Sequence, residues 1–144
     1  MPPTVLMLGW GYPPNVTGGL DTAIYELFEE FKLRDDFQIE LVLPAEFAPE
    51  DEPNIYGVET GDGDFITRVT AMVDTFRERA GDADIVHTND WFGYKPGSEA
   101  KEAHDVPWVT CFHSLSAERN RDPPPVELEA ERNIVEEADH LLTV

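Results

Sequence analysis

Short apolar runs alternate with helical patterns along the chain, and this alternation limits the folds open to it. The apolar runs predict strands, of which the first has the character of a central strand covered on both faces: 5–9, 39–43, 85–88, 108–112 and 140–144. Apolar residues at 3.6-residue spacing predict helices in the intervening segments: 20–31, 65–76, 96–104 and 126–138. Together they predict an α/β fold, a doubly wound Rossmann-like parallel sheet with helices on both faces.

Two segments interrupt the pattern. Residues 45–63 are rich in proline, glycine and acid, which predicts a long surface excursion with one short strand at 55–58. Residues 114–125 predict a polar loop closed by three prolines. Gly81 is the expected end of the second helix.

The length predicts a single domain, and the cysteine content is typical of an intracellular protein. A chain of 144 residues can bury a single sizeable core. Cys111 is the one cysteine, which excludes a disulfide-built module. No apolar run approaches the ~20 residues that cross a bilayer, and the N-terminus lacks signal-peptide character. We therefore expect a cytoplasmic protein with no membrane insertion.

The chain is strongly acidic, with 30 Asp and Glu against 10 Lys and Arg and a formal charge of −20. This charge repels nucleic acid and anionic membranes, so neither is an expected partner. The acids are spread along amphipathic helices, which favours solvated helix faces over a disordered tail. Abundant carboxylates with few lysines are typical of halophilic proteins, in which salt screens the self-repulsion.

The loops that follow the strands hold the candidate site residues, because ligands of doubly wound folds bind at the carboxyl ends of the strands. The first loop, 10–19, ends in Gly18 and Gly19 at a predicted helix start. Helix N-terminal amides with no Cβ nearby can bind phosphate, although a tight turn that binds nothing is the alternative. Pro14 breaks the dinucleotide fingerprint, and no P-loop lysine follows, which disfavours NAD and ATP.

The second and third loops, 89–94 and 113–120, bring further polar groups. Asp90 follows a strand and can accept hydrogen bonds from sugar hydroxyls, and Trp91 can stack on a sugar or plug the domain. For His87 we favour a hydrogen-bonded core role. His113 can contact a substrate oxygen or cap its strand. The histidines and Asp90 lack compact zinc-ligand spacing, and no Gly-x-Ser-x-Gly elbow indicates a hydrolase.

Four segments in order carry a family resemblance. They read Trp-Gly-Tyr-Pro-Pro at 10–14 leading to Gly-Gly-Leu at 18–20, Asp-Ile-Val-His-Thr-Asn-Asp-Trp at 84–91, a strand ending His-Ser-Leu at 113–115, and Glu-Arg at 131–132 with Ala-Asp-His-Leu-Leu-Thr-Val at 138–144. Their order and spacing resemble the N-terminal Rossmann-type lobe of retaining GT-B glycosyltransferases of the glycogen-synthase-like and sucrose-synthase-like group.

The resemblance implies a site and a reaction. Gly18 and Gly19 would approach the diphosphate of a nucleotide-sugar donor, and His113 and Asp90 would be the catalytic residues, beside the reacting sugar and the acceptor. Relatives often carry histidine where this chain has Asn89, which leaves an acceptor contact there open. The implied reaction transfers a sugar to a hydroxyl acceptor with retention of configuration, with no metal and no cofactor.

The resemblance also implies that residues 1–144 are an incomplete N-terminal domain, a shortened piece or a split gene product. The C-terminal lobe that holds most of the nucleotide site is absent from the sequence, so we expect little transferase activity from this piece alone. Two alternatives remain: a stand-alone doubly wound binding or regulatory domain without catalysis, and an epimerase-like sugar-nucleotide enzyme. The missing dinucleotide fingerprint weakens the second.

Overall fold

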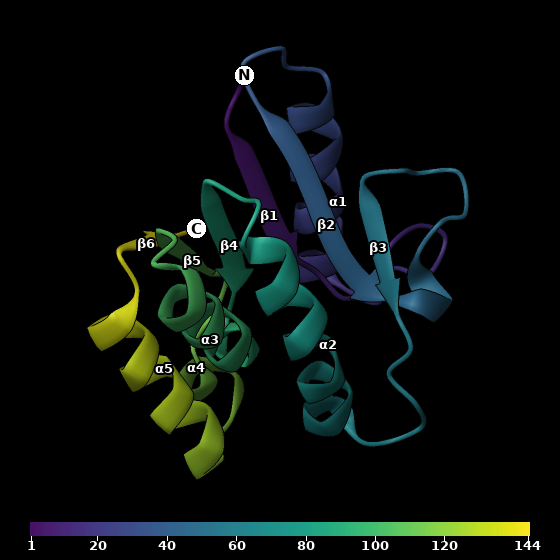
Figure 1. The fold of residues 1–144 in the computed structure, drawn as a ribbon. Helices are drawn as coiled ribbons and strands as arrows, with labels where there is room; N and C mark the ends of the chain where they lie inside the picture. Colours follow the sequence, from purple (N-terminus) through teal and green to yellow (C-terminus); the bar gives the residue numbers. More distant parts are fainter.

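A computed structural model describes residues 1–144 and contains one six-stranded, fully parallel sheet in the order β3-β2-β1-β4-β5-β6 (Figure 1). The strands are β1 (Thr4–Leu8), β2 (Gln38–Pro44), β3 (Ile55–Val58), β4 (Ile85–Asn89), β5 (Trp108–Phe112) and β6 (His140–Thr143). The order reverses direction between β1 and β4, where doubly wound folds bind ligands. The predicted fold class is confirmed.

Five α-helices connect the strands: α1 (Gly19–Lys32), α2 (Phe65–Ala80), α3 (Tyr94–His104), α4 (Ser116–Arg119) and α5 (Pro125–Glu137). The Asp64 side chain accepts a hydrogen bond from the Thr67 amide and caps the start of α2. Gly81 is the C-cap of α2, as predicted. None of the helices is both long and apolar enough to span a bilayer.

The core has two layers that the sheet separates. Helix α1 covers one face and buries Ile24 and Phe28 against Met7 and neighbouring strand residues; it lies behind β2 in Figure 1. Helices α2, α3 and α5 cover the other face, where Phe76, Ile134 and the indole of Trp108 are fully buried. Helices therefore lie on both faces, as the sequence predicts.

Two differences between the structure and the sequence prediction concern the segments next to the candidate site. The segment 114–125 is not a continuous polar loop, because it contains the four-residue helix α4, too short for a periodic pattern to reveal. Helix α3 begins at Tyr94, two residues before the predicted start, because the 3-10 turn Trp91–Gly93 leads directly into it. Pro96 thus lies in the first helical turn, where its missing N–H loses no bond.

Candidate functional site

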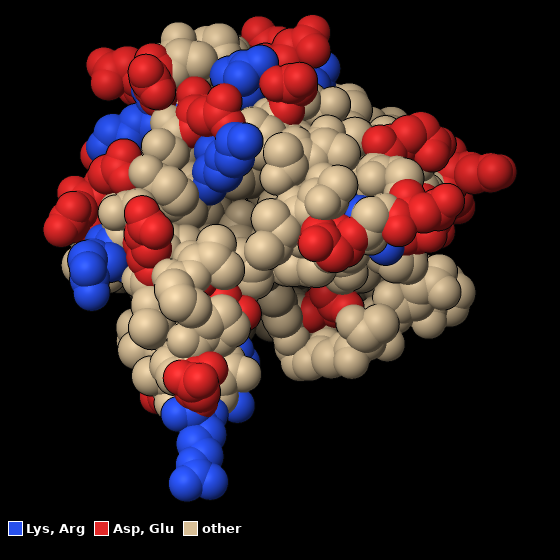
Figure 2. Space-filling view, turned by 90° about the horizontal axis from the view of Figure 1, so that it is seen from below, with Lys and Arg blue, Asp and Glu red and all other residues tan.

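The loops that follow β1, β4 and β5 lie side by side on one rim of the sheet. Adjacent parallel pairing places Met7 opposite His87 and His87 opposite Val109, so the three strands end at nearly the same level. Figure 2 views the molecule from this end. Tan residues make up most of the middle of this face, with a few acidic side chains among them, and most acidic and basic side chains lie around the periphery.

Asp21 holds the loop after β1 in shape. The carboxylate is only 4% exposed, and it accepts hydrogen bonds from the Gly11 amide at 3.0 Å and from the amide and hydroxyl of Thr17 at 3.0 and 2.8 Å. A Cβ on Gly11 would lie 2.4 Å from Asp21 Oδ2, so glycine is required there. The sequence alone does not predict this role of Asp21, although an acid in a first helical turn is a visible signal.

Gly18 and Gly19 lie at the start of α1, as predicted, and both are exposed. A Cβ on either would meet nothing within 4 Å, and Gly18 has an extended backbone with φ −178°, which other residues adopt. Neither packing nor backbone conformation within this chain therefore requires these glycines. No side chain caps the N-terminus of α1.

A hollow of about 310 Å³ lies beside Gly18. Its lining is mainly apolar: Trp10, Thr17, Gly18, Leu20, Asp21, Phe65 and Phe92. The rings of Trp10 and Phe65 meet edge to face at 4.6 Å between centroids. Trp91 also packs edge to face on Phe65, at 5.9 Å, so its indole is part of this aromatic cluster.

Hydrogen bonds join Asp90, Asn89 and His113. Asp90 is 6% exposed, and its Oδ1 accepts from the backbone amide of His113 at 2.8 Å, while its own amide donates to the Cys111 carbonyl at 3.0 Å. The imidazole Nε2 of His113 lies 2.9 Å from Asn89 Oδ1. Asp90 has a left-handed backbone with φ 54°, uncommon for a residue other than glycine. The observed contact of Asp90 thus orients the turn that carries His113.

His87 is buried, in line with its expected core role, but the expected hydrogen bond is absent from its Nε2 atom. Burial, with a smaller contribution from the nearby His113, lowers the pKa of His87 to about 4. The imidazole is therefore neutral at physiological pH. Cys111 is half-buried, and burial raises the pKa of its thiol.

The basic side chains of this chain are largely engaged with its own acids. Ion pairs involve seven of the ten Lys and Arg residues, namely Lys32, Arg34, Arg68, Arg77, Arg79, Lys101 and Arg119. None of the residues that line the hollow beside Gly18 is basic. A diphosphate bound there would find amide donors in this chain but would need its charge neutralised from elsewhere.

Residues 18–144 match the glycosyl transferase 4-like domain family, and the chain belongs to this family. An uncharacterised glycosyltransferase of Methanocaldococcus jannaschii is 26% identical over 126 residues, which are 80% of this chain and 32% of that protein. The chain therefore spans about a third of the length of this curated relative.

Solved structures support the fold. Sucrose-phosphate synthase from Thermosynechococcus elongatus has a TM-score of 0.75 at 16% identity, over 98% of this chain and 42% of that chain. The catalytic domain of starch synthase IV from Arabidopsis thaliana, bound to ADP and acarbose, has a TM-score of 0.56 at 15% identity, over 83% and 37%. The protein is thus a glycosyltransferase-like domain whose fold matches GT-B lobes.

The fold alone does not separate transferases from epimerases. A UDP-N-acetylglucosamine 2-epimerase has a TM-score of 0.65 at 16% identity, over 99% of this chain and 42% of that chain. The family match distinguishes the two classes here, because it assigns 127 of the 144 residues to a glycosyltransferase family.

The lowered pKa of His87 predicts a pH-dependent stability. An unfolded histidine has a pKa near 6.5, so the unfolded chain binds the proton more tightly and stability falls as the pH drops below about 6.5. Between pH 7.5 and pH 5 the wild type should lose about 2 kcal/mol more unfolding free energy than His87→Leu. Urea unfolding at the two pH values measures this, and equal losses in the two proteins would contradict the assigned burial effect.

Proposed function

We propose that this chain is the donor-facing and acceptor-facing N-terminal lobe of a retaining glycosyltransferase that acts on a nucleotide-sugar donor and a hydroxyl acceptor without a metal. The observation that carries the proposal is that two loops leave the sheet at the same rim: the one that ends in the uncapped helix start with Gly18 and Gly19, and the turn with His113. The family match supplies the reaction class. A stand-alone binding domain without catalysis is not favoured, because that match is to transferases.

The chemistry follows from where charge develops. The bond between the anomeric carbon and the donor phosphate oxygen breaks, and the acceptor oxygen forms its bond to the same face of that carbon. The acceptor proton passes to the departing phosphate oxygen. Amides of the first turn of α1 stabilise the growing negative charge, and His113 lies beside the reacting sugar. In this proposal Asp90 lies beside the acceptor, and its carboxylate also accepts the hydrogen bond from the His113 amide.

A second lobe completes the site in this proposal. Most basic residues here pair with acids of the same chain, so cations that neutralise the diphosphate come from the other wall of the cleft. This lobe alone is then a poor catalyst, because the reacting groups are held from one side only. The sheet end contributes amide donors and the histidine.

Gly18→Val tests the role of the glycine pair. The Cβ of residue 18 meets no atom of this chain, and the extended backbone accepts valine, so the unfolding free energy should change by less than about 0.5 kcal/mol. The side chain would occupy the space assigned to the diphosphate. In the two-lobed protein, meaning this chain together with the proposed second lobe, the donor KM should rise at least about tenfold, or about 1.4 kcal/mol. Steady-state kinetics with UDP-glucose and ADP-glucose measure it.

Gly11→Val is the matched control for this substitution. Its side chain would collide with Asp21, so it should destabilise the loop and the fold. A Gly18→Val protein with an unchanged donor KM would refute diphosphate binding at this position.

His113→Ala tests the catalytic role of His113. Loss of a positioned contact to the reacting centre should lower kcat of the two-lobed protein at least about 100-fold. Thermal melting of the variant controls for folding, since the imidazole makes only one hydrogen bond, to Asn89. Turnover equal to the wild type would show that His113 is not a catalytic residue.

A further inference from the structure

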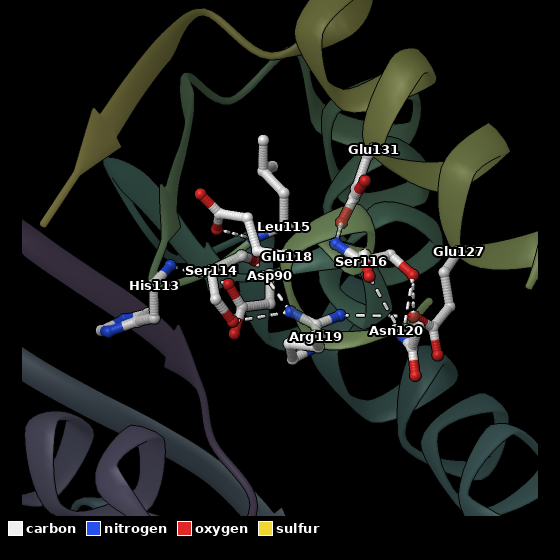
Figure 3. Close-up of polar contacts among 10 residues, drawn as sticks. All are labelled: Asp90, His113, Ser114, Leu115, Ser116, Glu118, Arg119, Asn120, Glu127 and Glu131. Carbon is white, nitrogen blue, oxygen red and sulfur yellow. Dashed lines mark hydrogen bonds and ion pairs between the residues drawn. The ribbon is translucent and has the colours of Figure 1, made fainter. Parts of the chain in front are cut away.

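Buried carboxylates hold both ends of the turn His113 to Ser116. At its start the amide of His113 donates to Asp90 Oδ1 at 2.8 Å, and at its end the amide of Ser116 donates to Glu131 Oε1 at 2.6 Å (Figure 3). Asp90 and Glu131 are 6% and 8% exposed, and they come from the end of β4 and from α5. Two elements far apart in sequence thus fix the same four-residue turn.

Side chains of the short helix α4 hold the middle of the turn. The Leu115 amide donates to Glu118 Oε2 at 2.8 Å, and Arg119 donates to the carbonyl and hydroxyl oxygens of Ser114 at 2.9 and 2.7 Å. Three of the four amides of the turn therefore donate to carboxylates. The Ser114 amide is the fourth, and no group of this chain accepts a hydrogen bond from it.

Glu131 has an unusual environment for an acid on a helix. None of the ion pairs of this chain includes Glu131, and the guanidinium of Arg119 pairs with Glu127 instead. A buried carboxylate without a cation is expensive to desolvate, and hydrogen bonds from backbone amides are what can offset that. The Ser116 amide provides such a bond, which ties the geometry of the turn to α5.

We infer that Glu131 is a positioning residue for His113: through the Ser116 amide it fixes the far end of the turn whose near end Asp90 fixes. The inference rests on the proposed function for its catalytic consequence, because His113 is the catalytic residue in that proposal. Glu131 touches neither the substrate nor the reacting atoms. Together, Asp90 and Glu131 determine where the His113 imidazole and the Ser114 amide lie on the rim.

The first test measures position without activity. In ¹H–¹⁵N spectra of the chain, Glu131→Ala should shift the His113 amide and ring resonances and speed hydrogen exchange at the Ser116 amide at least tenfold. Glu131→Gln keeps a carbonyl that accepts the same hydrogen bond, and it should resemble the wild type. Glu129→Ala is the matched control, because Glu129 is exposed on the same helix and makes no hydrogen bond to the turn.

A second variant covers the case in which Glu131→Ala does not fold. Glu131→Asp keeps the charge but shortens the side chain by one methylene, so it should draw the turn toward α5 and shift the His113 resonances. Unmoved His113 resonances in either folded variant would overturn the inference. So would a Glu131→Gln spectrum as perturbed as that of Glu131→Ala.

The second test measures the catalytic consequence in the two-lobed protein. Glu131→Ala should lower kcat at least tenfold with the donor KM within threefold of the wild type, and Glu131→Gln should restore kcat. A variant that only loses stability would keep its kcat per folded molecule, which would overturn the positioning role. If the wild type transfers no sugar, the proposed function fails, and the spectra still decide whether Glu131 positions His113.

Discussion

Parallel pairing of β1, β4 and β5 as neighbours is the constraint on which the site depends. Because parallel strands all point the same way, the loops after these three strands leave the sheet at one rim. The three strands lie inside the sheet and are buried, because helices on one face cover their residues Leu6, Val86 and Trp108. The packing that stabilises the core therefore places the glycine loop and the His113 turn on the same rim of the sheet.

Buried carboxylates then give these rim loops their shape. Asp21, Asp90 and Glu131 are all buried, and each accepts a hydrogen bond from a backbone amide of a rim loop. Charge-assisted bonds of this kind are stronger than neutral ones, which suits loops that must keep a fixed geometry without regular secondary structure. The acidic composition of the chain thus has a structural part at the rim, in addition to its solvated helix faces.

The sequence predicted the sheet, its helices and the place of the candidate residues, because periodicity and strand ends are local signals. It did not predict α4, because one helical turn leaves no periodic pattern, nor the contacts of Asp21 and Glu131. Those contacts depend on which amide lies within 3 Å after folding, and Glu131 is separated by 15 residues from its partner Ser116. His87 shows the same limit, since the sequence indicated its burial but not its unpaired Nε2 atom.

The central claim is that the helix start at Gly18 and the turn at His113 form one wall of a single nucleotide-sugar site. Hydrogen–deuterium exchange of the two-lobed protein, with and without UDP-glucose or ADP-glucose, tests it most directly. A donor that binds should protect residues 17–22 and 113–116 together. Protection of only one of these segments, or of neither when a donor binds, would contradict it.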